Sequence, residues 1–299
     1  MTTTEKTNDA AAGFTLVELL VVVAIIGTLI GMLLPAVQRA RESGRRAACS
    51  NSIRQQGVAI SNYEAARRMF PPGSDSYTAD PATQPARLHA WSSFILPFLE
   101  ESAVAVKIDY KKVWNAPGGN DIASDAVLPV YVCPSGIERF PGKQDYAGIT
   151  GYSDGDNITR PLRLFGDRGV LIPTSFVDSS GVDPVNRYRQ PVRAAAVTDG
   201  LSRTVLVAEA VDRSHEGGST APSAERFQDA RWACGNNIVC QSSRVLNDPA
   251  EQGFRSLHPN GVNCLFSDGH VKFLEESVDA EVLFAICTRD GAETAATGL

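Results

Sequence analysis

The sequence predicts an α+β protein in which a long N-terminal, transmembrane α-helix packs on a mostly antiparallel β-sheet head. Two patterns predict this class. An uncharged apolar run fills residues 19–37, and apolar residues then recur at three- and four-residue steps, which is the period of a helix. Beyond residue 74, short β-branched runs alternate with turn residues, as in antiparallel sheets.

Composition excludes several classes of protein. The 299 residues carry a formal net charge of -6, so the clustered Lys and Arg that nucleic-acid binding needs are not expected, and no nucleic-acid partner is predicted. The six cysteines are too sparse for a disulfide-dense small scaffold. None of the usual nucleophile, zinc-protease or phosphate-loop motifs is present, so no enzymatic activity is expected.

The apolar run predicts one membrane span. Its 19 residues would make a helix of about 28 Å, close to the roughly 30 Å of a bilayer core. A buried core helix is the alternative, but a segment that is apolar on every face is unusual in such a helix. A secretory signal peptide fits poorly, because residues 1–13 carry Lys6 against Glu5 and Asp9 and the apolar run is too long.

A carboxylate, Glu18, lies one turn into the predicted membrane helix, directly before the apolar run. Insertion scales put a charge at the helix centre at about 2.5–3.5 kcal/mol, so such a residue normally has a partner. If the chain were cut between Gly13 and Phe14, the new amine of a neighbouring copy could pair with Glu18. A plain membrane anchor remains the other interpretation.

The stretch GFTLVELLVVVAIIG at residues 13–27 resembles the N-terminal signature of type IV prepilins and type II secretion pseudopilins. The resemblance implies that prepilin peptidase cleaves after Gly13 and methylates Phe14, the new N-terminus. It makes Glu18 the fifth mature residue and Pro35 the site of a helix bend. Other pilin-like subunits and the membrane would then be the partners.

The resemblance implies a single-pass protein of the bacterial inner membrane. Its leader would be cytoplasmic and its head periplasmic or at the cell surface. The positive-inside rule favours the opposite orientation, because Lys6 precedes the span whereas Arg39, Arg41, Arg45 and Arg46 follow it. We expect the N-terminus inside, as the resemblance requires.

The predicted domains are a leader (1–13), a transmembrane helix (14–37), a helix extension (38–70) and a globular head (71–299). The sequence Phe70-Pro71-Pro72-Gly73 should end the helix. Two helices that break near Ser43-Gly44 are the alternative. In the head, a helix is expected at 90–106 and strands at 127–133, 192–198, 204–208, 262–266 and 271–274.

Several segments of the head together resemble the bacterial family defined by the domain of unknown function DUF1559. They are residues 49–57, Tyr63, 70–73, 91–100, 130–135, 145–148, 198–204 and the C-terminal pattern H-x9-D-G at His258, Asp268 and Gly269. The resemblance covers residues 13 to about 292, and it implies no settled biochemical role.

The C-terminal pattern at 258–269 predicts a β-hairpin. Its first strand lies within these residues, and its second strand follows Gly269. A two-residue Asp268-Gly269 loop would pair Phe266 with Val271 and Cys264 with Phe273. One interpretation of His258, Asp268 and His270 is a metal or catalytic site. The other is a structural role, in which His258 bonds the adjacent loop and Asp268 closes the turn. The structural role is favoured, and no metal site is predicted. Zinc held by His258, Cys264 and His270 is weaker still, because Cys264 and His270 would face opposite sides.

Two further features carry open alternatives. Cys234 and Cys240 could form a local disulfide in an exported domain. The run Asp154-Gly155-Asp156-Asn157 offers calcium three close side chains, but a solvated turn is the favoured interpretation and no cofactor is expected.

The sequence therefore predicts a pilin- or pseudopilin-like, membrane-anchored subunit. It would assemble through its N-terminal helix into a type II secretion or type IV pilus-like structure. The alternative is an anchored extracytoplasmic module that binds a glycan or secreted cargo and does not polymerise.

Overall fold

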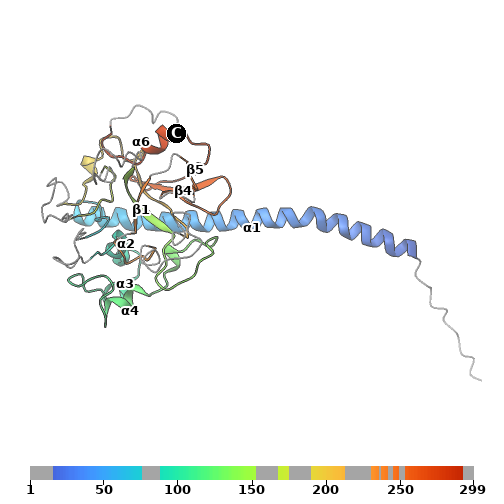
Figure 1. Ribbon diagram of the computed structural model, residues 1–299, viewed down its shortest axis with the longest axis horizontal. Coiled ribbons are helices and arrows are strands. Elements are labelled where there is room, and N and C mark those ends of the chain that lie inside the picture. The colour runs from blue at the N-terminus through green and yellow to red at the C-terminus, as the bar shows by residue number, and fades with distance from the viewer. Residues whose placement is uncertain are drawn as a thin grey trace, which may run out of the picture. The chain divides into compact units, whose positions relative to one another are not determined.

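The computed structural model describes residues 16–75, 88–152, 168–174, 190–212, 230–235, 237–241, 245–248 and 253–291, with side chains for all of these except 238–241. By its internal contacts the chain divides into two compact units, Met1–Gly44 and Arg45–Leu299. We call the second unit the head. Figure 1 shows the order of the elements along the chain.

One continuous helix, α1 (Leu16–Arg67), accounts for 52 residues and contains Pro35. The prediction of one helix is confirmed, and the alternative of a break near Gly44 is wrong. The helix ends three residues before the predicted stop, because Arg68 adopts a left-handed φ of 62° and its N–H donates to the Glu64 carbonyl at 2.6 Å. Pro71 and Pro72 then follow, and neither could continue the helix.

The N-terminal part of α1 exposes its apolar side chains. Leu16 is 79% exposed, Val23 60% and Met32 70%. Among the described residues, α1 is the helix that is long and apolar enough to cross a membrane.

The head is built on a five-stranded sheet with the order β3-β1-β2-β4-β5. Four strands are antiparallel neighbours, and β3 runs parallel to β1 at one edge. The strands are β1 (Tyr146–Tyr152), β2 (Val205–Glu209), β3 (Ile238–Gln241), β4 (Gly261–Phe266) and β5 (Val271–Glu275). The α+β, pilin-like class is thus confirmed: a long N-terminal helix packs against a mostly antiparallel sheet.

Short helices lie mostly between α1 and β1, with one between β1 and β2 and one after β5. They are α2 (Trp91–Ile95), the 3₁₀ helix η1 (Leu96–Phe98), α3 (Ser102–Ala105), α4 (Asn120–Ser124), the 3₁₀ helices η2 (Pro129–Tyr131) and η4 (Ala194–Ala196), and α6 (Ala280–Ala285). The predicted helix at 90–106 is helical in three pieces, and Pro97 lies in the first turn of the middle one, where its missing N–H is tolerated.

The sheet is covered on both faces, which explains why the residues of its central strands β2 and β4 are all buried. On one face, Ile53 and Ile60 of α1 pack with Leu206 and Leu265. On the other, Leu283 of α6 joins a cluster that includes Val262, Cys264 and Phe266. All six residues of β4 are buried, as expected for a strand with two covered faces. Figure 1 shows that the C-terminal part of α1 runs into the head.

Three predicted strands are confirmed as β2, β4 and β5, but two are wrong. Residues 127–133 contain η2, which starts at Pro129, and proline cannot donate to a strand ladder. Residues 192–198 contain η4, formed by three alanines. Both segments are apolar because they pack into the core as irregular chain.

The hairpin register predicted at 264–273 is also wrong, by one residue. Leu265 pairs with Val271 and Cys264 with Lys272. The loop has three residues rather than two, because the Gly269 N–H donates to the Phe266 carbonyl at 2.9 Å and Gly269 itself has a φ of 92°. A left-handed glycine after a type I turn adds one bulged residue and shifts the pairing.

Candidate functional site

The N-terminal site that the sequence predicts lies partly outside the described residues. Gly13 and Phe14, the predicted cleavage pair, are not among them, so cleavage and methylation remain predictions. Glu18 lies in the first turn of α1 and is exposed. Pro35 lies further along the same helix.

The residues of the C-terminal pattern have separate environments. Asp268 accepts hydrogen bonds from the backbone N–H of His270 at 3.1 Å and pairs with its Nδ1 at 2.6 Å. Both side chains are exposed, so Asp268 closes the turn as predicted. His258 is only 3% exposed, and its N–H donates to Ser256 Oγ at 3.0 Å.

The imidazole of His258 belongs to a buried cluster that joins four distant parts of the chain. Cys49 comes from α1, Cys133 follows η2, Glu209 ends β2, and His258 precedes β4. Their sulfur, nitrogen and carboxylate oxygen atoms all lie within 4.8 Å of one another. Cys49, Cys133 and Glu209 are fully buried. We call these four residues the Cys2GluHis cluster.

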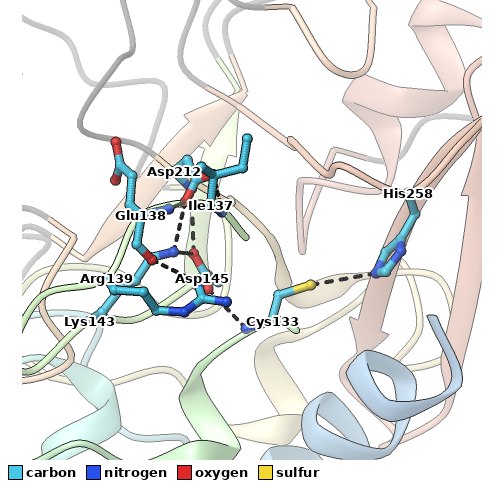
Figure 2. Close-up of polar contacts among 8 residues, drawn as sticks. All are labelled: Cys133, Ile137, Glu138, Arg139, Lys143, Asp145, Asp212 and His258. Atoms are coloured by element: carbon cyan, nitrogen blue, oxygen red, sulfur yellow. Dashed lines mark hydrogen bonds and ion pairs between the residues drawn. The ribbon is translucent and has the colours of Figure 1, made fainter. Parts of the chain in front are cut away.

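The imidazole lies between the other groups of the cluster. His258 Nε2 is 3.6 Å from Cys133 Sγ and 3.4 Å from Glu209 Oε1. The carboxylate is fixed by Asn263, whose backbone N–H donates to Oε2 at 2.7 Å and whose side-chain amide donates to Oε1 at 3.0 Å. Figure 2 shows the Cys133 sulfur directed at His258.

A buried charged group supports Cys133 from the opposite side. The Cys133 N–H donates to Asp145 Oδ2 at 2.9 Å, and Lys143 Nζ lies 2.8 Å from Asp145 Oδ1 and 2.7 Å from Asp212 Oδ1. Figure 2 shows Lys143, Asp145 and Asp212 together on the side of Cys133 that faces away from His258. The Lys143 ammonium thus pairs with two buried carboxylates. One of these, Asp145, in turn holds the Cys133 backbone in place.

The electrostatics of the cluster favour one ionised sulfur. A hydrogen bond from the Cys49 thiol lowers the pKa of Cys133 to about 6, and the hydrogen bond with His258 acts in the same direction, against the effect of burial. The same contact with Cys133, together with burial, raises the pKa of Cys49 far above its usual value. A thiolate is the form of cysteine that binds metals.

Two sequence-based predictions concern parts of the chain that the structure does not describe. The first is the disulfide between Cys234 and Cys240: Cys234 is buried, but the side chain of Cys240 is not described, so this disulfide stays a prediction. The acidic run at 154–157 also lies outside the described residues.

The head also has an apolar surface pocket near the Lys143 group, of about 570 Å³. Its lining is mostly proline and other apolar side chains, with the charged residues Arg139 and Lys143 at its border. The apolar members are Val127, Pro129, Val132, Pro134, Phe140 and Pro141. A pocket of this size can hold a small apolar ligand.

Sequence reasoning missed the Cys2GluHis cluster because its members are at least 49 residues apart along the chain. No local spacing motif therefore exists. One signal was present at Glu209, a carboxylate between Ala208 and Ala210 within an apolar strand. Charged side chains are almost never fully buried unless they are paired.

Comparison with known proteins identifies two family models in the chain. The model described as a protein of unknown function, DUF1559, matches residues 38–281. The prokaryotic N-terminal methylation motif matches residues 8–34. No curated protein and no solved structure matches the chain at a significant level.

The methylation motif implies prepilin-like processing by prepilin peptidase. Together with the exposed apolar helix, it indicates a membrane-anchored protein with an extracytoplasmic head. The DUF1559 match covers more than half of the residues, and the chain therefore belongs to the DUF1559 family.

Proposed function

We propose that the protein is a pilin- or pseudopilin-like subunit, cleaved between Gly13 and Phe14, that assembles with other copies through its N-terminal helix. The observation that carries this proposal is the helix surface over residues 16–37. From residue 19 it is apolar on all sides and exposed, and the match to the methylation motif, residues 8–34, covers most of it. The proposal assigns the chain no catalytic step.

An exposed apolar surface of this extent needs an apolar partner. Leu29 is 55% exposed, Ile30 57% and Leu33 61%. Lipid can serve as the partner before assembly, and the equivalent helices of other copies can serve afterwards. Two glycines one turn apart, Gly27 and Gly31, have open space where a Cβ would stand. Small residues at this spacing let two helices approach closely in a membrane.

In this proposal, Glu18 determines how neighbouring subunits align along the helix axis. After cleavage, the N-terminal amine would belong to Phe14, which is four residues before Glu18 along the chain. A positive amine from a neighbouring copy can neutralise this carboxylate, whereas either charge alone is costly in lipid. The pairing therefore favours one axial offset between adjacent subunits.

The proposed orientation places the N-terminus in the cytoplasm. Two of the four arginines that oppose it have other roles in the head. Arg45 Nε donates to Ser135 Oγ at 3.2 Å, and the Arg46 guanidinium lies 3.3 Å from the centroid of the Phe273 ring. These contacts give both arginines a structural reason to follow the span, so their positive charge is a weaker topological signal.

Replacement of Glu18 tests the assembly. A photo-crosslinking residue at Leu29 should give a ladder of oligomers in membranes that contain the otherwise unchanged chain. Glu18→Gln should insert normally but reduce the ladder by about tenfold or more, since the neighbour's amine loses its counter-charge. Glu42→Gln is the matched control, because it makes the same change on the same helix beyond the apolar run. An undiminished ladder in the Glu18→Gln chain would refute the pairing.

The second candidate is an anchored binding module that does not polymerise. The apolar pocket of about 570 Å³ is the observation that favours it. In that case the full chain in detergent would bind a glycan or secreted cargo, and Phe140→Ser would weaken binding while the crosslinks at Leu29 stayed absent.

A further inference from the structure

We propose that Cys49, Cys133, Glu209 and His258 together bind one Zn²⁺ ion that ties α1 to the sheet. The sequence alone predicts no metal site, so this inference comes from the convergence of the four side chains. It is independent of the proposed assembly, because all four ligands lie in the Arg45–Leu299 unit.

Two of the distances within the cluster match those between ligands of a shared tetrahedral ion, and all four ligand atoms lie within 4.8 Å of one another. Zinc binds sulfur at about 2.3 Å and nitrogen or oxygen at about 2.0–2.2 Å, so neighbouring ligand atoms lie about 3.3–3.8 Å apart. The observed separations are 3.6 Å for Cys133 Sγ to His258 Nε2 and 3.4 Å for His258 Nε2 to Glu209 Oε1. The second is longer than a good N–H···O hydrogen bond, which spans about 2.7–3.2 Å.

The donor set also suits zinc. Two thiolates, one imidazole and one carboxylate combine the soft and borderline ligands that Zn²⁺ accepts in four-coordinate sites. Calcium and magnesium require oxygen ligands and would not use the two sulfurs. Four protein ligands complete the tetrahedral shell, so the site would be structural rather than catalytic.

A cation would balance the negative charge that the cluster carries once both of its thiols have lost their protons. In the part of the chain that the structure describes, no lysine or arginine pairs with Glu209, although this carboxylate is fully buried. Two thiolates and one carboxylate carry three negative charges, which Zn²⁺ reduces to one. Buried charges of one sign are otherwise neutralised by protons, and zinc binding would release the thiol protons.

Hydrogen bonds from surrounding groups hold the proposed ligands, as is usual in protein metal sites. Asn263 holds both oxygens of Glu209, and Asp145 holds the backbone of Cys133. The carbonyl of Cys49 accepts a hydrogen bond from Tyr146 Oη at 3.4 Å. Such contacts fix the orientation of the ligands and contribute to affinity.

A disulfide between Cys49 and Cys133 is the competing use of the two sulfurs, since an extracytoplasmic head permits disulfides. In the structure both cysteines are thiols. A disulfide would engage only the two sulfurs, whereas zinc engages all four groups of the cluster.

The decisive experiment measures metal in the full-length protein, purified in detergent without chelators. Elemental analysis should find about one zinc per chain. His258→Ala and Cys133→Ser should each reduce this by about tenfold or more. His270→Ala and Cys264→Ala are the matched controls and should retain the zinc, because His270 is exposed and Cys264 is buried outside the cluster.

Two measurements keep the proposal testable if a ligand variant fails to fold. Asn263→Ala leaves the four ligands in place and should weaken zinc binding about 10- to 100-fold. Replacement of zinc by Co²⁺ in the unsubstituted chain should produce the absorption bands of a tetrahedral, thiolate-ligated ion.

Three results would overturn the assignment. They are a chain free of zinc whose mass and peptide map show a Cys49–Cys133 disulfide, a different metal at full occupancy, or zinc retained in both His258→Ala and Cys133→Ser. None of them bears on cleavage at Gly13, so failure of this inference is distinguishable from failure of the assembly proposal.

Discussion

The two parts of α1 share a secondary structure but differ in what covers them. In the Met1–Gly44 unit, large apolar side chains such as Leu29 and Met32 are exposed. In the head, Ile53 and Ile60 of the same helix are fully buried against the sheet. The second part finds its partner within the chain, whereas the first part must find it in lipid or in another copy.

The apolar part of α1 and the head also differ in their charged residues. From residue 19 to 37 the helix carries no ionisable side chain, whereas the head buries Lys143, Asp145 and Glu209 and arranges polar partners for each. The head is therefore stabilised by contacts between its own buried charged side chains and their polar partners. The N-terminal part depends on its surroundings instead.

The largest expected effect follows from removal of the cation inside the head. Lys143→Met leaves Asp145 and Asp212 buried without their ammonium partner, which should lower the free energy of unfolding by about 3–5 kcal/mol. Unfolding in urea can be followed by tryptophan fluorescence, because all three tryptophans lie in the head. Lys112→Met is the control, since its ion pair with Asp109 is largely exposed and is worth at most about 1 kcal/mol. Equal effects of the two changes would contradict this account.

The next prediction compares one substitution in both parts of α1. Ile60→Ala should lower the stability of the head by about 2–5 kcal/mol, because the side chain is fully buried in the core and its removal leaves a cavity. Leu29→Ala should leave the unfolding of the head unchanged, since Leu29 lies in the other unit. The same fluorescence assay measures both. A large effect of Leu29→Ala would mean that the two parts of the helix are not independent.

A smaller effect is expected at alkaline pH, and it concerns the head alone because residues 1–44 contain no tyrosine. Burial, with the nearby charge of Asp75, raises the pKa of Tyr110 from 10.0 to about 12. The folded state therefore keeps the phenol proton that the unfolded state loses. The contribution of Tyr110 to stability should be intact below pH 10 and fall by at most about 3 kcal/mol between pH 10 and pH 12. Burial also raises the pKa values of Tyr131 and Tyr146, so these groups add to the decline of the unsubstituted chain.

Tyr110→Phe tests this pH dependence. The variant loses the hydrogen bond from Tyr110 Oη to the Ser93 carbonyl, which should cost about 1 kcal/mol at neutral pH. Its urea midpoint should then decline less than that of the unsubstituted chain between pH 10 and pH 12. Parallel declines would show that Tyr110 does not carry the effect.

The sequence predicts those parts of the fold that depend on local pattern. Helix α1 follows from apolar periodicity, and β2, β4 and β5 follow from β-branched runs. Strand β1 was missed because Gly148 and Gly151 weaken its pattern, and glycine in a strand often marks a close approach. At Gly148 a Cβ would lie 2.9 Å from the Trp91 ring. Only the fold reveals such a contact.

The candidate site is less predictable than the fold. Gly13, Phe14 and Glu18 belong to one short contiguous motif, so sequence alone can predict them, and their roles stay predictions. The Cys2GluHis cluster depends instead on the packing of α1, the segment after η2, β2 and the loop before β4. The position of Cys133 in turn depends on Asp145 and Lys143, and no local pattern specifies that arrangement.

The most direct test of the central claim is the mass of the N-terminal peptide from native membranes. The account predicts a mature chain that begins at methylated Phe14. The reason is that the exposed helix is proposed to pack against other subunits that prepilin peptidase has processed. A chain that still begins at Met1 or Thr2 would contradict the account. It would make α1 a plain anchor and leave the head as the functional part of the protein.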